Sequence, residues 1–156
     1  MKREILFRGK RIDSGEWVEG LLIANFDGNY SIQVRHDFDG MEYFATYKVD
    51  PETVCQFIGG KGFEDAKNEH FVKGESNEVK LFEGDIVEAW SEGGKGIFVI
   101  KMRTEAQPTF MLYPNGQHGK MWNIAFSDIG SDKFDYYDDL RKIGNIHDNP
   151  EFMPKN

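Results

Sequence analysis

The sequence lacks several features that would mark a secreted or membrane-bound protein. It contains one cysteine, Cys55, so an intrachain disulfide is impossible and nothing points to an oxidising compartment. No stretch approaches the roughly 20 apolar residues of a membrane-spanning helix. The residues after Met1 include no apolar run long enough for a signal peptide. We therefore expect a cytoplasmic protein that does not associate with membranes.

Prolines are also scarce, at five against 17 glycines. Many glycines between short aromatic runs predict frequent turns, and frequent turns favour short strands over long helices. Hydrophobic residues make up 39% of the 156 residues and aromatic residues 14%, so the chain can build a folded core. We therefore expect a mainly β protein, in the sense of a β-dominated α+β fold.

Basic residues are fewer than acidic ones. The chain has 19 basic and 27 acidic residues, which gives a net charge of −8. Phosphate contacts dominate nucleic-acid affinity, and a negative field opposes them. Compact positive charge comes only from Arg8, Lys10 and Arg11, and from Arg141 with Lys142. Nucleic acid is therefore an unexpected partner, and the charge is interpreted as an aid to solubility.

The first half of the chain reads as short strands separated by turns. Asp27-Gly28-Asn29 has the composition of a tight hairpin turn, and Asp37-Phe38-Asp39-Gly40 predicts another. Residues 61–80 are polar with little apolar pattern, and we interpret them as a linker or loop. Strands are predicted over residues 4–8, 17–24, 30–35, 41–49 and 54–58. We assign residues 1–75 to an N-terminal antiparallel sheet.

The second half carries a further series of short strands, and residues 76–156 are assigned to a second domain. Gly84-Asp85 predicts the turn that opens it, and Pro150 suits the first turn of a helix. Strands are predicted over residues 86–90, 97–103, 109–113 and 141–146, with 121–126 as a strand or a short helix. Five short strands in this space suit a small closed barrel, which removes free sheet edges.

Two groups of carboxylates are candidate metal ligands. Asp37-Phe38-Asp39-Gly40 resembles the start of a calcium loop, but its twelfth position is Lys48, where such a loop needs Glu. A denser cluster could hold Mg²⁺ weakly, although such a run is more typical of a solvated edge. This cluster consists of Asp128, Asp132, Asp135, Asp138 and Asp139. We expect no metal site.

The other candidate groups lack the spacing that their chemistry requires. Cys55 lies in a predicted strand, where a buried and inert thiol is expected. Gly59-Gly60-Lys61-Gly62 and Gly93-Gly94-Lys95-Gly96 lack the pattern of a phosphate loop, and the second predicts a hairpin loop. No ligand spacing connects His36, His70, His118 and His147. We therefore expect no catalytic residue and no cofactor.

Four ordered motifs resemble the YopX family of phage and prophage proteins. They are Lys10-Arg11 with Gly15–Gly20, Asp50–Gly59, Glu83–Val87 and Ile143–Phe152. The resemblance implies a phage or prophage origin, an N-terminal β region, a C-terminal five-stranded Src-homology-3-like barrel and self-assembly. It supplies no catalytic residues. The chain departs from the family pattern at Cys55 and Ile58, where a glycine and a threonine are expected, and in the length of residues 61–80.

These observations favour a non-enzymatic phage or prophage protein that forms a homo-oligomer or binds a phage or host protein. Aromatic residues are enriched at protein interfaces, so the tryptophans are the first candidates. The possible interface residues are Trp17, Val18, Phe57, Trp90 and Trp122. One alternative is a nucleic-acid-interacting regulator of a phage. A second is a metal-dependent enzyme that uses the carboxylates between Asp128 and Asp139.

Overall fold

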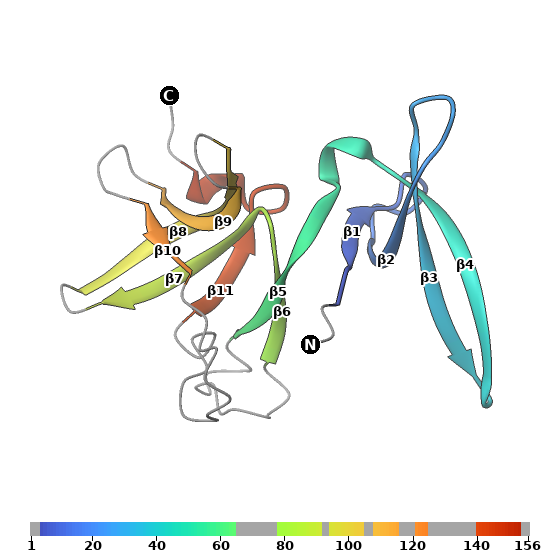
Figure 1. Cartoon of the computed structure of the whole chain (residues 1–156), viewed down its shortest axis with the longest axis horizontal. Coiled ribbons are helices and arrows are strands. Elements are labelled where there is room, and N and C mark those ends of the chain that lie inside the picture. Colours follow the sequence, from blue (N-terminus) through green and yellow to red (C-terminus); the bar gives the residue numbers. More distant parts are fainter. Residues whose placement is uncertain are drawn as a thin grey trace. The chain divides into compact units, whose positions relative to one another are not determined.

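In the structure, a computed structural model, most of the described residues lie in strands (Figure 1). It describes residues 4–64, 78–91, 94–104, 108–115, 121–124 and 140–153. The chain divides into two compact units, unit 1 (Met1–Gly59) and unit 2 (Gly60–Asn156). The prediction of a mainly β protein is confirmed. Within the described ranges, no helix has the length and apolar character needed to cross a membrane.

Unit 1 is an antiparallel arrangement with the strand order β5-β1-β2-β3-β4. Its strands are β1 (Phe7–Lys10), β2 (Trp17–Ala24), β3 (Tyr30–Phe38), β4 (Met41–Val49) and the first part of β5 (Cys55–Phe63). The apolar run 17–24 and the segment 41–49, which is bounded by a turn and by Pro51, predict β2 and β4 with these bounds. β1 begins at Phe7 rather than at residue 4, and β3 continues past Arg35 to Phe38.

The core of unit 1 depends on a bend in β2. The first half of β2 pairs with β1 and the second half with β3, through pairs such as Phe7↔Gly20 and Leu22↔Ile32. A Cβ atom at Gly20 would collide with the backbone carbonyl of Gln33, so only glycine fits at this bend. Ile32 and Val49 are fully buried behind it.

One end of unit 1 is closed by hydrogen bonds between the end of β4 and the segment that follows β1. The Asp50 N–H donates to the Lys10 carbonyl at 2.8 Å, and the Ile12 N–H donates to the Lys48 carbonyl at 3.0 Å. Between these bonds, Arg11 forms an isolated bridge with Val49. The base of β4 is therefore covered on both edges, by β3 on one side and by residues 10–12 on the other.

Strand β5 crosses the boundary between the units. Its first residues pair with β1, as in Arg8↔Cys55, and Phe63 near its other end pairs in parallel with Arg141. The division at Gly59/Gly60 thus lies inside a strand, and the predicted domain boundary at residue 75 stays a prediction. The glycine pair suggested a strand end, and Gly59 does take a positive φ of 95°, but the backbone resumes an extended course after it.

The prediction of a linker over residues 61–80 is wrong at both ends. β5 extends to Phe63, and the strand β6 (Glu78–Phe82) occupies the other end of the segment. β6 was missed because its first residues are polar and show no clear alternation. β6 pairs with β5, so both ends of the segment belong to one ladder. Residues 65–77 lie outside the described residues.

In unit 2, the last strand of the chain, β11, lies between the earlier strands β7 and β5. Besides β6 it contains β7 (Asp85–Ser91), β8 (Gly94–Arg103), β9 (Thr109–Pro114), β10 (Trp122–Asn123) and β11 (Leu140–Asn145). The order is β10-β9-β8-β7-β11, with β11 also beside β5. The 3-10 helix η3 (Pro150–Phe152) follows and starts at Pro150, as predicted. Closure of these strands into a five-stranded barrel stays a prediction.

The core of unit 2 draws on β6, β7, β8, β9 and β11. Every one of these strands contributes a side chain that is almost completely buried. The buried apolar residues are Leu81, Phe82, Ile86, Val87, Ala89, Phe98, Val99, Ile100, Met111, Leu112 and Leu140. Unit 2 therefore has a core built from several strands, which is the usual basis of an independently stable domain.

Candidate functional site

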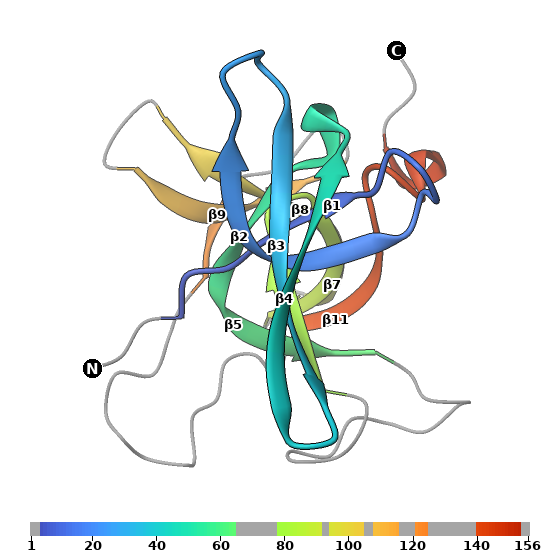
Figure 2. The same ribbon diagram turned by 90° about the vertical axis from the view of Figure 1, so that its right-hand side faces the viewer.

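The main candidate site is the outer part of the β3–β4 hairpin, residues 34–45, which we call the arm. β2 pairs with β3 only as far as Leu21↔Gln33, whereas the pairing of β3 with β4 continues to Phe38↔Met41 (Figures 1 and 2). The arm is thus a two-stranded ribbon. Such a ribbon is at best marginally stable by itself in water, and three or more strands with an apolar face are needed for independent stability.

The tip of the arm is a two-residue turn. Asp39 and Gly40 have φ angles of 52° and 77°, and they connect the directly paired Phe38 and Met41. Positive φ at both central residues is the requirement of a type I′ turn, whose twist matches that of paired strands. The Asp-Gly turn predicted from the sequence is confirmed, and it keeps the arm in an unbroken register.

The two faces of the arm differ in composition. The register places Val34 opposite Ala45, His36 opposite Tyr43, and Phe38 opposite Met41, so all six side chains share one face. We call these six residues the apolar face. Phe38 and Met41 are each 73% exposed and Tyr43 is 49% exposed. An exposed contiguous apolar surface commonly marks a site of protein–protein contact.

Aromatic contacts order the apolar face toward its base. The His36 and Tyr43 rings are stacked, with centroids 5.0 Å apart and planes at 18°. The Nε2 atom of His36 lies 3.4 Å from the Tyr47 hydroxyl, and the Arg11 guanidinium lies 4.2 Å from the Tyr47 ring centroid. These contacts tie the base of the arm to the closed end of unit 1 and leave Phe38 and Met41 at the outer end.

Of the five predicted interface residues, the structure describes the side chains of Trp17, Val18 and Phe57 only. Trp17 and Val18 are half-buried, and as neighbours on β2 they point to opposite faces. Phe57 is only 5% exposed and is a core residue, so it offers little surface to a partner. Trp90 and Trp122 lie in β7 and β10, and their side chains lie outside the described residues.

Sequence reasoning missed the residues of the arm. The alternation in 30–35 and 41–49, combined with the Asp39-Gly40 turn, was enough to place Phe38, Met41 and Tyr43 on one face. It could not reveal whether another part of the chain covers this face, because alternation identifies a face but not what packs against it.

The basic residues of β1 do not form an open binding surface. The Arg8 guanidinium lies 4.8 Å from the Trp17 ring centroid, and the Lys10 ammonium lies 5.3 Å from it. Arg8 is only 4% exposed. A tryptophan ring that stacks a base needs an accessible face, and here two cations already lie against the ring.

The other members of the two predicted basic groups, Arg11, Arg141 and Lys142, lie beside carboxylates. Arg11 donates two hydrogen bonds to Asp13, from Nε at 2.9 Å and from Nη2 at 2.7 Å. This pairing raises the pKa of Arg11 and lowers that of Asp13, chiefly through the side-chain hydrogen bonds. In unit 2, Arg141 pairs with Glu88 at 2.6 Å and Lys142 lies 3.5 Å from Asp85. Neither basic group therefore supports the nucleic-acid alternative.

The two motifs of unit 1 form its closed end. Asp50 caps the 3-10 helix η1 (Pro51–Thr53) by accepting from the Glu52 N–H at 3.0 Å. The buried Thr53 hydroxyl accepts from the Lys10 N–H at 2.9 Å and donates to the Asp50 carbonyl at 2.7 Å. The Asp50–Gly59 motif and the Lys10-Arg11 motif are thus joined, and their conspicuous polar residues have structural roles.

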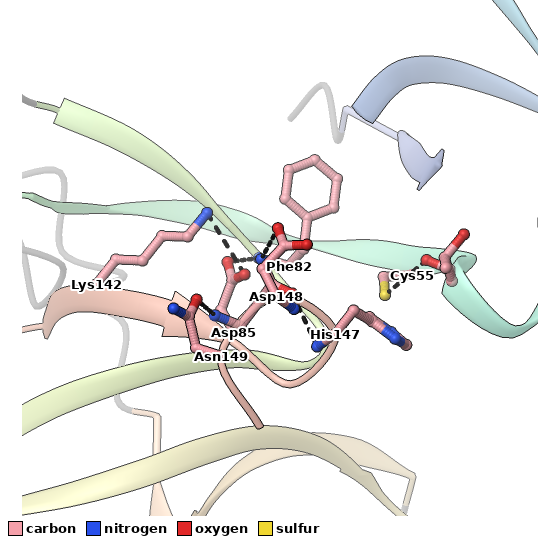
Figure 3. Close-up of polar contacts among 9 residues, drawn as sticks. Cys55, Phe82, Asp85, Lys142, His147, Asp148 and Asn149 are labelled. Atoms are coloured by element: carbon pink, nitrogen blue, oxygen red, sulfur yellow. Dashed lines mark hydrogen bonds and ion pairs between the residues drawn. The ribbon is translucent and has the colours of Figure 1, made fainter. Parts of the chain in front are cut away.

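The two motifs of unit 2 also meet each other (Figure 3). Asp85 has no exposed surface, and its Oδ2 accepts from the Phe82 N–H at 2.8 Å.

The Ile146 N–H donates to the Gly84 carbonyl at 2.9 Å, and Asn145 pairs with Asp85 across the strands. The Asn145 side chain accepts from the N–H groups of both His147 and Asp148. These contacts build a turn and give Asp85 and Asn145 structural roles in it.

The remaining candidates lie partly inside and partly outside the described residues. Cys55 is buried, as predicted, and its thiol donates to the Thr53 carbonyl at 3.2 Å. In the described part of the chain, no three His, Cys, Asp or Glu residues group as a metal ion requires. His70, His118 and the Asp128–Asp139 cluster lie outside the described residues. Gly94 and Gly96, expected in a hairpin loop, belong to β8 and pair with β7.

Comparison with known proteins bears on the family alone. No curated protein and no solved structure matches the chain. The family model described as YopX protein matches residues 6–154, which is nearly the whole chain and includes all four motifs. The chain therefore belongs to the YopX family.

Proposed function

We propose that the chain is a non-enzymatic phage or prophage protein that acts in the cytoplasm by assembling with itself or with another protein through the arm. The observation that carries the proposal is the apolar face, where Phe38 and Met41 project from a ribbon that unit 1 does not cover. Side chains of this kind cost little stability when removed from a monomer and contribute strongly when a partner buries them. Membership of the YopX family is consistent with a phage-type protein.

Sedimentation analysis of the full chain over a wide concentration range tests the proposal. We expect association that grows with concentration, and we expect Phe38→Ser/Tyr43→Ser to weaken it about tenfold or more, because central aromatic residues dominate binding energy. Phe26→Ser is the matched control, since Phe26 is a fully exposed phenylalanine outside the arm. We expect this control to associate like the wild type.

Two results would overturn the proposal. One is a wild-type chain that stays monomeric at all concentrations and that retains no phage or host protein in an arm-dependent manner. The other is an association that Phe26→Ser and Phe38→Ser/Tyr43→Ser reduce equally, because then the arm would have no special part in it.

A further inference from the structure

We propose that the partner of the arm is a second copy of this chain, and that the two copies join β4 to β4 in antiparallel orientation with Phe44 on the two-fold axis. This inference rests on the proposed function and names its partner and its geometry. It concerns the outer edge of β4, whereas the function proposed above concerns the apolar face.

The outer edge of β4 is a ready template for another strand. The Lys48 carbonyl accepts from Ile12, so the backbone groups of Lys48 point away from β3. Backbone direction alternates along a strand and the β3–β4 register is unbroken, so Glu42, Phe44 and Thr46 also present N–H and C=O to the outer edge. No strand among the described residues pairs with this edge between Glu42 and Thr46.

The usual protections of an edge strand are missing here. Natural edges are blunted by prolines, bulges, several charges or a covering segment. Residues 42–46 contain no proline and one charged residue, Glu42, and their pairing with β3 has no bulge. Joining two arms edge to edge gives the four-stranded order β3-β4-β4-β3, which exceeds the three strands needed for independent stability.

Charge and side-chain pattern favour a second copy in antiparallel orientation. β4 carries Glu42 near one end and Lys48 near the other. Antiparallel pairing centred on Phe44 sets Glu42 of each copy opposite Thr46 of the other and diagonal to its Lys48, within reach of long side chains. Parallel pairing in register would instead bring like charges together.

Phe44 itself selects the register. It is 55% exposed and is the one large apolar residue on a face otherwise formed by Arg35, Asp37 and Glu42. On the axis, the two Phe44 rings would face each other as a cross-strand aromatic pair. A register centred on Ala45 would put Glu42 of the second copy opposite Lys48, where Ile12 already lies. In the register centred on Phe44, the pairing between the two β4 strands does not extend to Lys48.

Cysteine cross-linking of the full chain tests this geometry, in a Cys55→Ala background that removes the buried natural thiol. Directly paired residues have Cα atoms about 5.5 Å apart, which a disulfide can span. We expect Phe44→Cys to form a disulfide-linked dimer under mild oxidation. Glu42→Cys is the matched control, because its own copy lies about four residues, or roughly 13 Å, away along the strands. Glu42→Cys/Thr46→Cys should restore cross-linking, and it retains Phe44.

A charge exchange gives an independent readout. We expect Glu42→Lys to weaken the dimer by about two- to tenfold and Glu42→Lys/Lys48→Glu to recover most of the loss, since the diagonal pairs are re-formed with opposite signs. If the wild type associates but neither Phe44→Cys nor the double cysteine variant cross-links faster than Glu42→Cys, the β4 geometry is overturned while the proposed function stands. A wild type that never self-associates overturns both self-assembly and this geometry.

Discussion

Unit 1 and unit 2 use their apolar residues in different ways. Among the described residues, nine of the ten exposed large hydrophobic side chains lie in unit 1, and Met121 is the exception. The buried apolar residues show the opposite distribution, with eleven of sixteen in unit 2. Burial of apolar surface is the main favourable term in folding, whereas an exposed apolar surface gains that free energy only when a partner covers it. Among the described residues, unit 2 therefore buries most of its large apolar side chains, whereas unit 1 leaves many of them exposed.

The carboxylates Asp85 and Asp13 also differ in their exposure. Asp85 of unit 2 is fully buried and accepts a backbone hydrogen bond beside Lys142. Asp13 of unit 1 pairs with Arg11 at the surface, where its side chain is 67% exposed. Buried ionic groups are costly to disturb, whereas exposed pairs contribute little because water and salt screen them.

The largest expected effect comes from truncating a core phenylalanine of unit 2. Phe82→Ala should destabilise unit 2 by about 3–5 kcal/mol, because it removes a fully buried side chain and leaves a cavity. Phe38→Ala in the arm should change the stability of the monomer by less than about 0.5 kcal/mol. Hydrogen exchange at increasing urea, read separately for peptides of each unit at low protein concentration, measures both values. Equal losses would mean that the arm is buried in solution and would remove the contrast.

An intermediate effect is expected from the buried carboxylate. Asp85→Ala should cost roughly 2–4 kcal/mol, because the Phe82 N–H loses this acceptor and Lys142 loses a neighbouring negative charge. Asp85→Asn keeps an oxygen that can accept from Phe82, so it should cost about half as much. Urea unfolding of unit 2 measures both. If the two variants were equally unstable, the charge rather than the hydrogen bond would be the dominant contribution of Asp85.

The smallest effect is expected from the exposed pair of unit 1, and it should depend on pH. Arg11 lowers the pKa of Asp13 in the folded state. The pair therefore stabilises the fold above the ordinary Asp pKa, and this stabilisation is lost as the pH falls through the lowered pKa. Asp13→Asn should be slightly less stable than the wild type at neutral pH and equal to it in acid. Thermal unfolding at several pH values and salt concentrations tests this. The ion-pair explanation would be contradicted if the stability difference between Asp13→Asn and the wild type persisted in acid or did not change with salt concentration.

Local sequence patterns predicted most strands but not the places where strands cross boundaries. The bounds of β2 and β4 follow from alternation and turn residues, which act within a few positions. β5 was predicted to end at Ile58 because glycines usually interrupt a strand, yet it runs to Phe63 by pairing first with β1 and then with β11. β6 was missed because its stability comes from the burial of Leu81 and Phe82 against distant residues rather than from local pattern.

The candidate site was harder to predict than the fold. Tryptophan type alone selected Trp17, which the structure places half-buried against Arg8 and Lys10. The arm is defined by the absence, among the described residues, of a third strand beside β3 beyond Gln33. The sequence of β3 and β4 does not indicate where the pairing of β3 with β2 ends, because the length of a neighbouring strand is encoded in another segment.

The position of β11 in unit 2 has a consequence for how the chain folds during synthesis. β11 pairs with β7 on one side and with Phe63 of β5 on the other, so residues far apart in sequence must meet before this ladder is complete. Long-range pairing of this kind slows folding, whereas a hairpin such as β3–β4 forms locally within about 1–10 μs. During synthesis, the β3–β4 hairpin can therefore form while unit 2 still awaits its last strand.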